Sequence, residues 1–159
     1  MPPDDDAKLD LEGFLPYRLS NLAERISQAL SSIYAEQFDL TIAQWRIVAW
    51  LQQEGTLTAK RICQLTAMDK ARVSRAVSQL LERELIERRR DPDDQRTLWL
   101  SLAPDGLALL DELIPRALDW ESQLTETLSA TEYRELFRLL AKVDSGLARC
   151  ISAATTRQT

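Results

Sequence analysis

The sequence lacks histidine altogether and is poor in cysteine and glycine. Histidine is the commonest general base and transition-metal ligand, so its absence excludes Ser–His and Cys–His catalytic pairs and makes a zinc site unexpected. The four glycines form no phosphate-binding loop. Two cysteines, Cys63 and Cys150, are too few for a disulfide framework. We therefore expect a protein that is not an enzyme and that holds no metal or cofactor.

Long apolar runs are also missing. No stretch approaches the roughly 18 consecutive apolar residues of a membrane-spanning helix, and the opening residues MPPDDD have neither the basic nor the apolar part of a secretory signal. The hydrophobic content of 45% is ordinary for a globular protein. The sequence therefore predicts a cytoplasmic protein without a membrane partner.

Positive charge is scarce overall, because the formal net charge is −5 and the isoelectric point is about 4.9. It is nevertheless concentrated in residues 58–97, which hold ten of the twenty lysines and arginines against seven of the twenty-five acidic residues. Salt screens charges beyond roughly 10 Å, so a polyanion senses this local excess more than the net charge. The segment is a candidate nucleic-acid-binding surface, with an ordinary solvated helix face as the alternative.

The first part of this segment has the pattern of a helix, a turn and a second helix. Thr58 is placed to cap the first helix, and Asp69 to cap the second after a turn at 67–68. Apolar residues share one face of the second helix: Val73, Ala76, Val77, Leu80 and Leu81. The opposite face carries donors and small polar groups, the types that meet base edges and phosphates in a major groove: Lys70, Arg72, Ser74, Arg75, Ser78 and Gln79.

Two strands are expected after these helices. Residues 85–90 form the first, and residues 97–102 form the second, with leucines alternating on one side. The intervening residues 91–96 are polar and form the tip of a hairpin. A helix-turn-helix followed by a basic hairpin describes a winged helix-turn-helix.

Long amphipathic helices flank the winged segment. Apolar residues recur at helical spacing from about 14 to 37, again after Pro104, and again in a last helix that follows a capping box at Ser129–Glu132. Pro115 lies inside the second of these helices and predicts a kink or a break there. A second capping box is expected where Thr41 and Gln44 start a helix within the winged segment.

We therefore predict a mainly α-helical fold with a small β-hairpin wing, in which a winged helix-turn-helix is flanked by long N- and C-terminal dimerisation helices. The expected segments are a disordered acidic N-terminus at 1–11, an N-terminal helix at 12–40, the winged helix-turn-helix at 41–103, C-terminal helices at 104–153 and a frayed tail at 154–159. A second copy would bury the apolar helix faces and match the two-fold symmetry of operators. A helical bundle within one chain is the alternative.

In these residues the chain resembles the MarR family of bacterial transcription regulators. The resemblance is carried by residues 68–77 (MDKARVSRAV), Leu80, residues 85–88 (LIER), 91–96 (DPDDQR) and 100–102 (LSL). The chain departs from the family pattern at three positions. Glu84 stands where a glycine often ends the recognition helix, so either a left-handed residue there costs about 1 kcal/mol or the helix ends differently. Gln95 replaces a common wing arginine, and Ala103 replaces a threonine cap.

The resemblance implies a homodimer that binds a palindromic operator in double-stranded DNA. The residues expected to contact DNA come from both helices and the wing: Thr58, Lys60, Lys70, Ala71, Arg72, Ser74, Arg75, Gln79, Arg89, Asp94 and Arg96. Arg72 and Arg75 are the expected contacts to bases or adjacent phosphates. Arg96 is expected to enter the minor groove, oriented by a charge-assisted hydrogen bond that its guanidinium donates to Asp94. An ion pair that only stabilises the hairpin is the alternative for these two residues.

Regulators of this family often respond to small aromatic or anionic ligands bound between the dimer helices and the wing domain. The candidate lining here is Tyr17, Arg18, Trp45 and Arg46. An arginine beside aromatic side chains suits a carboxylate or phenolate on an apolar body. Core packing of Trp45 and an interface ion pair of Arg18 are the alternatives. The expected function is thus a repressor released by a small ligand, and the competing hypothesis is a winged-helix protein-interaction module without specific DNA binding.

Overall fold

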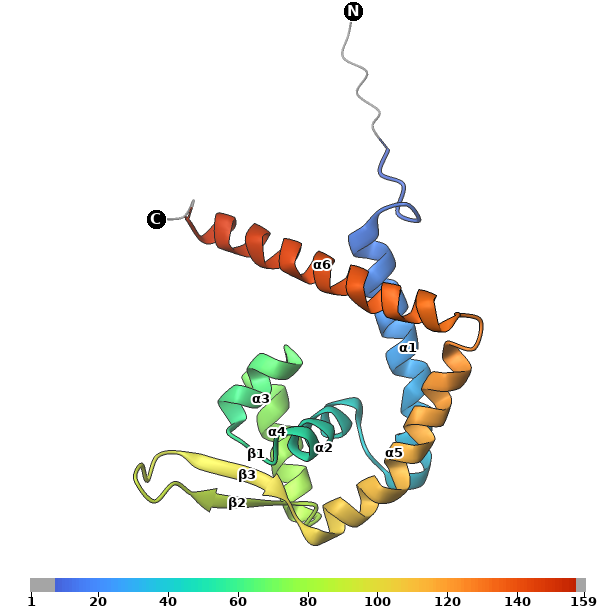
Figure 1. The fold of residues 1–159 in the computed structure, drawn as a ribbon. Coiled ribbons are helices and arrows are strands. Elements are labelled where there is room, and N and C mark those ends of the chain that lie inside the picture. Colours follow the sequence, from blue (N-terminus) through green and yellow to red (C-terminus); the bar gives the residue numbers. More distant parts are fainter. Residues whose placement is uncertain (1–7, 157–159) are drawn as a thin grey trace, which may run out of the picture. The chain divides into compact units, whose positions relative to one another are not determined.

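The computed structural model describes residues 8–156, and Figure 1 shows the order of their helices and strands. The elements are α1 (Leu15–Phe38), α2 (Ile42–Glu54), β1 (Thr56–Leu57), α3 (Ala59–Thr66), α4 (Lys70–Glu82), β2 (Ile86–Arg90), β3 (Leu98–Leu102), α5 (Pro104–Leu124) and α6 (Ala130–Thr156). They divide into two compact units, one up to Ala117 and the other from Leu118 onward. The predicted mainly helical fold with a winged helix-turn-helix is confirmed.

The ends of the described chain bear on two expected segments. Residues 1–7 of the predicted disordered N-terminus and residues 157–159 of the predicted tail lie outside the described residues. Helix α6 continues to Thr156, so the helix is longer than its apolar pattern indicated. None of the described helices is long and apolar enough to cross a membrane.

The predicted caps form. Thr41 Oγ1 accepts the backbone N–H of Gln44 at 3.2 Å, and Gln44 Oε1 accepts the N–H of Thr41 at 3.0 Å, which completes the capping box of α2. The same reciprocal pair joins Ser129 and Glu132 at the start of α6. These bonds satisfy N–H groups that would otherwise lack a partner in the first helical turn.

The wing contains a strand that the sequence did not predict. Its sheet has the order β1-β3-β2, with both pairs antiparallel. Strand β1 is only two residues long and pairs Thr56 with Ser101 and Leu57 with Leu100. Two residues carry no period-two pattern, so the hairpin β2–β3 was visible in the sequence and β1 was not. The third strand ties the hairpin to the end of α2.

The core of the first unit fixes the orientation of α4. Val73, Ala76 and Leu80 on α4 are 0–3% exposed, and they join a cluster that includes Ile47 of α2 and Ile62 of α3. Full burial of a large apolar side chain contributes roughly 1.5–3 kcal/mol. Because these residues recur at three- and four-residue spacing, burying them leaves the opposite face of α4 in solvent.

The start of α5 presses against the wing. A Cβ atom at Gly106 would lie 2.0 Å from the carbonyl oxygen of Leu85, far inside van der Waals contact. The same oxygen accepts the N–H of Ala103 at 3.0 Å. Only glycine fits where the helix comes this close to the backbone of Leu85.

Helix α5 continues without interruption through Pro115. Of the two outcomes predicted for this proline, a kink or a break, the break is therefore wrong.

The recognition helix α4 ends at a left-handed residue. Glu84 has a φ of +56°, and its neighbour Leu85 donates its N–H to the carbonyl of Leu80 at 3.0 Å. The first of the two outcomes expected for Glu84 is therefore confirmed. A side chain in this conformation costs about 1–2 kcal/mol relative to a right-handed one.

Replacing Glu84 with glycine should stabilise the protein by about 0.5–1 kcal/mol. Glycine relieves the left-handed strain, and part of that gain is offset by the greater freedom of the unfolded chain. Urea denaturation measures the difference. Glu82→Gly is the matched control, because it removes the same charge from a right-handed helical position and should destabilise by up to about 1 kcal/mol. Equal destabilisation by both changes would contradict the explanation.

Candidate DNA-binding surface

The first turns of α4 bring most of the predicted helix contacts together on one exposed surface. Asp69 caps this helix, because its Oδ1 accepts the backbone N–H of Arg72 at 2.8 Å. The predicted residues Lys70, Ala71, Arg72, Ser74 and Arg75 are all exposed. The Asp69 carboxylate thus binds the backbone at the helix start and not the guanidinium group of Arg72.

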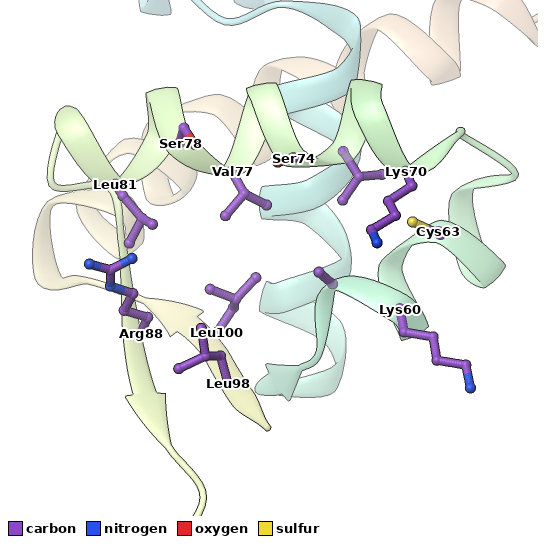
Figure 2. A pocket seen from close by; sticks show the side chains of 12 residues that line it. Lys60, Cys63, Lys70, Ser74, Val77, Ser78, Leu81, Arg88, Leu98 and Leu100 are labelled. Atoms are coloured by element: carbon purple, nitrogen blue, oxygen red, sulfur yellow. The ribbon is translucent and has the colours of Figure 1, made fainter. Parts of the chain in front are cut away.

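The two predicted residues at the start of α3 have different surroundings. Thr58 is half-buried, and its Oγ1 accepts the N–H of Arg61 at 3.2 Å, so the hydroxyl oxygen serves as the helix cap. Lys60 is exposed. Figure 2 shows Lys60 and Lys70 at the same end of the space between the helices and the wing. A cation from α3 thus lies beside the first turn of α4.

Gln79 is exposed on the same side of α4 as Arg72 and Arg75, but its side chain has a hydrogen-bond partner within the protein. Its Oε1 accepts a hydrogen bond at 2.9 Å from Nε2 of Gln44, which is only 4% exposed. Gln79 also lines a small hollow together with Asp39 and Arg83, on the flank of α4 toward α1 and α2. The sequence pattern placed it with the polar face, but the buried partner on α2 could not be inferred from that pattern.

Asp94 shapes the wing tip through the backbone. Its Oδ1 accepts the backbone N–H of Arg96 at 3.0 Å, and its Oδ2 accepts the hydroxyl of Thr97 at 2.8 Å. The expected bond from Asp94 to the guanidinium of Arg96 is therefore replaced by a bond to the main chain. Arg96 is exposed, as are Arg88, Arg89 and Arg90 of β2. The backbone of the tip is held by these hydrogen bonds, and Arg90 adds another by donating to the carbonyl of Gln95 at 2.7 Å.

Asp91 and Trp99 form a second wing contact that the sequence analysis missed. Asp91 Oδ2 accepts the indole Nε1–H of Trp99 at 2.7 Å, and Oδ1 accepts the N–H groups of Asp93 and Asp94. These bonds lower the pKa of the Asp91 carboxyl below its usual value, with the indole bond as the largest cause. The spacing of Asp91 and Asp93 in the sequence could have predicted the turn at the wing tip. It could not have predicted the bond to Trp99, which lies on the other strand of the hairpin.

A cavity of about 610 Å³ lies between α3, α4 and the wing. Figure 2 shows Val77 and Leu81 of α4 facing Leu98 and Leu100 of β3 across it. Lys60, Lys70 and Arg88 lie around this apolar lining. The cavity therefore combines an apolar interior with cationic groups, and it adjoins the exposed face of α4.

The predicted ligand-binding residues fall into two places. Trp45 stacks on Tyr34 with ring centroids 5.4 Å apart, and Arg46 approaches Ser27 Oγ at 3.5 Å. Tyr17 and Arg18 lie at the other end of α1, roughly 15 Å along its axis from Ser27 at about 1.5 Å per residue. A single chain therefore does not gather the four residues around one site.

Comparison with known proteins places the chain in a family. The family model described as MarR family matches residues 38–97, which span α2 to the wing. A solved structure of a probable transcriptional regulator from Pseudomonas aeruginosa is 32% identical, with a TM-score of 0.69, and the match covers 84% of this chain and 99% of that one. The chain belongs to the MarR family. It is thus a member of a family of DNA-binding transcriptional regulators.

Two further solved structures are similar to this chain over most of their length. The MarR/EmrR family transcriptional regulator from Acinetobacter sp. ADP1 has a TM-score of 0.81 at 27% identity, covering 89% of this chain and 99% of that one. The structure of BpsR from Bordetella bronchiseptica concerns regulation of its DNA binding by 6-hydroxynicotinic acid. It has a TM-score of 0.66 at 28% identity, covering 80% of this chain and 98% of that one.

The Asp91–Trp99 contact predicts an acid-sensitive wing. Because the folded-state pKa of Asp91 is lowered, the contact is fully present at neutral pH and is lost as the pH falls through that lowered pKa. The indole N–H resonance of Trp99 should therefore shift only below the ordinary aspartate pKa of 3.8. In Trp99→Phe, carboxyl NMR should show the pKa of Asp91 moving back up toward that value. An unchanged pKa in this variant would show that the indole is not the main cause.

Proposed function

We propose that the protein is a homodimeric, sequence-specific DNA-binding repressor that a small aromatic or anionic ligand releases from its operator. The observation that carries the proposal is the cationic surface of the first unit. Exposed arginines of α4 and of the wing lie on one winged helix-turn-helix, while the chain as a whole carries a net charge of −5. A surface of this kind attracts a polyanion through local charge.

The proposed contacts follow from the grooves of DNA. Lys70, Ala71, Arg72, Ser74 and Arg75 would enter the major groove with the first turns of α4. A bidentate arginine–guanine pair contributes roughly 1–3 kcal/mol of discrimination. Thr58, Lys60 and Arg89 would hold the phosphate backbone, and Arg96 would reach the minor groove from the wing. Asp94 would act by fixing the backbone on which Arg96 stands. Gln79 is left out, because its amide is bonded to Gln44.

The proposed dimer would bury apolar faces that one chain leaves in solvent. Helix α6 has no buried residue along its 27 positions. Its exposed large apolar side chains include Phe137, which is 53% exposed, and Leu147, which is 56% exposed. At the start of α1, Leu15 and Leu22 are also exposed. Exposed apolar residues at helical spacing along a helix are typical of an interface, and two-fold symmetry would match a palindromic operator.

The effector site is proposed to form only in the dimer. Trp45 and Arg46 would line it from one protomer, and Tyr17 and Arg18 would reach it from the second copy, because one chain keeps them apart. The similarity to BpsR supports a small aromatic acid as the ligand class. The cavity of Figure 2 is a second candidate site, favoured by its apolar lining and its cations. A ligand there would compete directly with DNA for α4.

Replacing Arg96 with alanine should weaken operator binding at least tenfold without lowering the melting temperature of the dimer. Loss of one positive charge from the DNA interface should also make log K fall less steeply with log salt, with a slope smaller in magnitude by up to about 0.9. The operator is first obtained by selecting bound duplexes from a random pool, which should return two related half-sites. Arg134→Ala is the control, because it removes the same charge from an exposed position on α6. Binding to no duplex at any salt concentration would favour a protein-interaction module.

A thermal-shift panel of aromatic acids, including 6-hydroxynicotinic acid, should identify ligands that raise the melting temperature. A ligand at 100 times its Kd stabilises the folded state by about 2.7 kcal/mol. The stabilisation should vanish in Arg46→Ala if the dimer site binds the ligand, and in Arg88→Ala if the cavity beside α4 does. If no acid in the panel raises the melting temperature, the proposed ligand class is wrong.

A further inference from the structure

The flank of α4 that faces away from the wing carries a long-range contact. Arg83 follows the last helical residue and donates from Nη1 to the carbonyl of Asp39 at 2.6 Å and from Nη2 to the carbonyl of Phe38 at 2.9 Å. The donor and acceptors are 44 and 45 positions apart in the sequence. One guanidinium therefore connects the end of the recognition helix to the end of α1.

The two acceptors suit a cation. Phe38 is the last residue of α1, and Asp39 is its left-handed cap with a φ of +51°. Carbonyls at a helix C-terminus lack intrahelical partners and carry partial negative charge. Arg83 supplies two donors in a fixed planar fork, so the contact constrains direction as well as distance.

A second contact lies one helical turn earlier. Gln79 accepts from the side-chain amide of the buried Gln44 at 2.9 Å. The orientation of that amide is set by the capping box, because Gln44 Oε1 already accepts the N–H of Thr41. Only its amide nitrogen remains to donate to α4. The N-terminal cap of α2 is thereby extended to the recognition helix.

Together the two contacts hold α4 at two points on one flank. The apolar residues under the helix resist its removal from the core, but apolar contacts are not directional and allow small rotations and shifts. Hydrogen bonds at 2.6–2.9 Å are directional. They fix how far α4 is rotated about its axis and where it lies along that axis relative to α1.

We propose that Arg83 and Gln79 are positioning residues. They hold the recognition helix to the end of α1 and the start of α2, and the position of those two helix ends thereby sets the angle at which the recognition helix meets DNA. This inference rests on the proposed function, because it assigns these residues to operator discrimination. The correct base contacts need the helix in one orientation, whereas phosphate attraction tolerates several. Loss of the contacts therefore weakens specific binding more than random binding.

The first test compares affinities for the selected operator and for a random duplex at one salt concentration. Arg83→Ala is expected to weaken operator binding about tenfold and to change random binding less than twofold. Arg83→Lys, which keeps the charge and some donors, is expected to fall between wild type and alanine. Arg134→Ala is the charge-matched control and should change neither affinity. Equal losses on both duplexes would overturn the inference, because they would mark Arg83 as an ordinary phosphate contact.

The second test measures geometry without DNA. Nitroxide labels are attached to cysteines introduced at the exposed positions Ser32 of α1 and Ser78 of α4, and Cys63 and Cys150 are changed to serine so that they are not labelled. Excess unlabelled protein is added so that only distances within one protomer are measured. Pulsed electron paramagnetic resonance measures the distance between the two labels. Its distribution should be broader in Arg83→Ala, and also in Gln79→Ala, than in the labelled parent protein. Unchanged distributions would overturn the inference even if the operator is bound. If the parent protein shows no preferred duplex, the proposed function fails, and the distance distribution alone decides whether the contacts position α4.

Discussion

The structure depends on the burial of one face of a thirteen-residue helix. Val73, Ala76 and Leu80 lock α4 into the core of the first unit, and the periodicity of the helix then decides which side chains face solvent. The exposed groups of α4 that we propose meet DNA are positioned by that constraint. The wing adds cations at the edge of the same unit, and β1 anchors the wing to the end of α2.

Acidic residues near this surface bind main-chain N–H groups, and in the described part of the winged segment they form no salt bridge with its arginines. Asp69, Asp91 and Asp94 each accept backbone N–H groups at a helix start or at the wing tip. Within the described residues, the salt bridge that forms joins Arg138 and Glu135, both on α6. The carboxylates therefore add rigidity without neutralising nearby guanidinium groups through direct contact. This division of roles explains how an acidic protein keeps a cationic surface.

Local signals in the sequence predicted local structure well. Caps at Thr41, Thr58, Asp69 and Ser129 depend on residues three positions apart. For Glu84 the sequence left two outcomes open, and the structure has the left-handed one. The misses involve partners far along the chain or elements too short to show a period. Gln79 belongs with Gln44, Trp99 with Asp91, and β1 has two residues. The predicted ligand residues share chemistry, but the geometry of α1 separates them.

The close approach of Gly106 to Leu85 has a consequence for how such a regulator diversifies. Exposed positions on α4 tolerate many side chains, so new base preferences can arise there by single substitutions. Position 106 has no such freedom, because any larger residue would push the start of α5 away from the carbonyl of Leu85. That carbonyl also accepts the backbone N–H of Ala103. A library aimed at altered operator choice should therefore randomise the former positions and keep this glycine invariant. Descendants of this gene should differ most at the α4 positions that we propose meet bases, and least at this helix–wing junction.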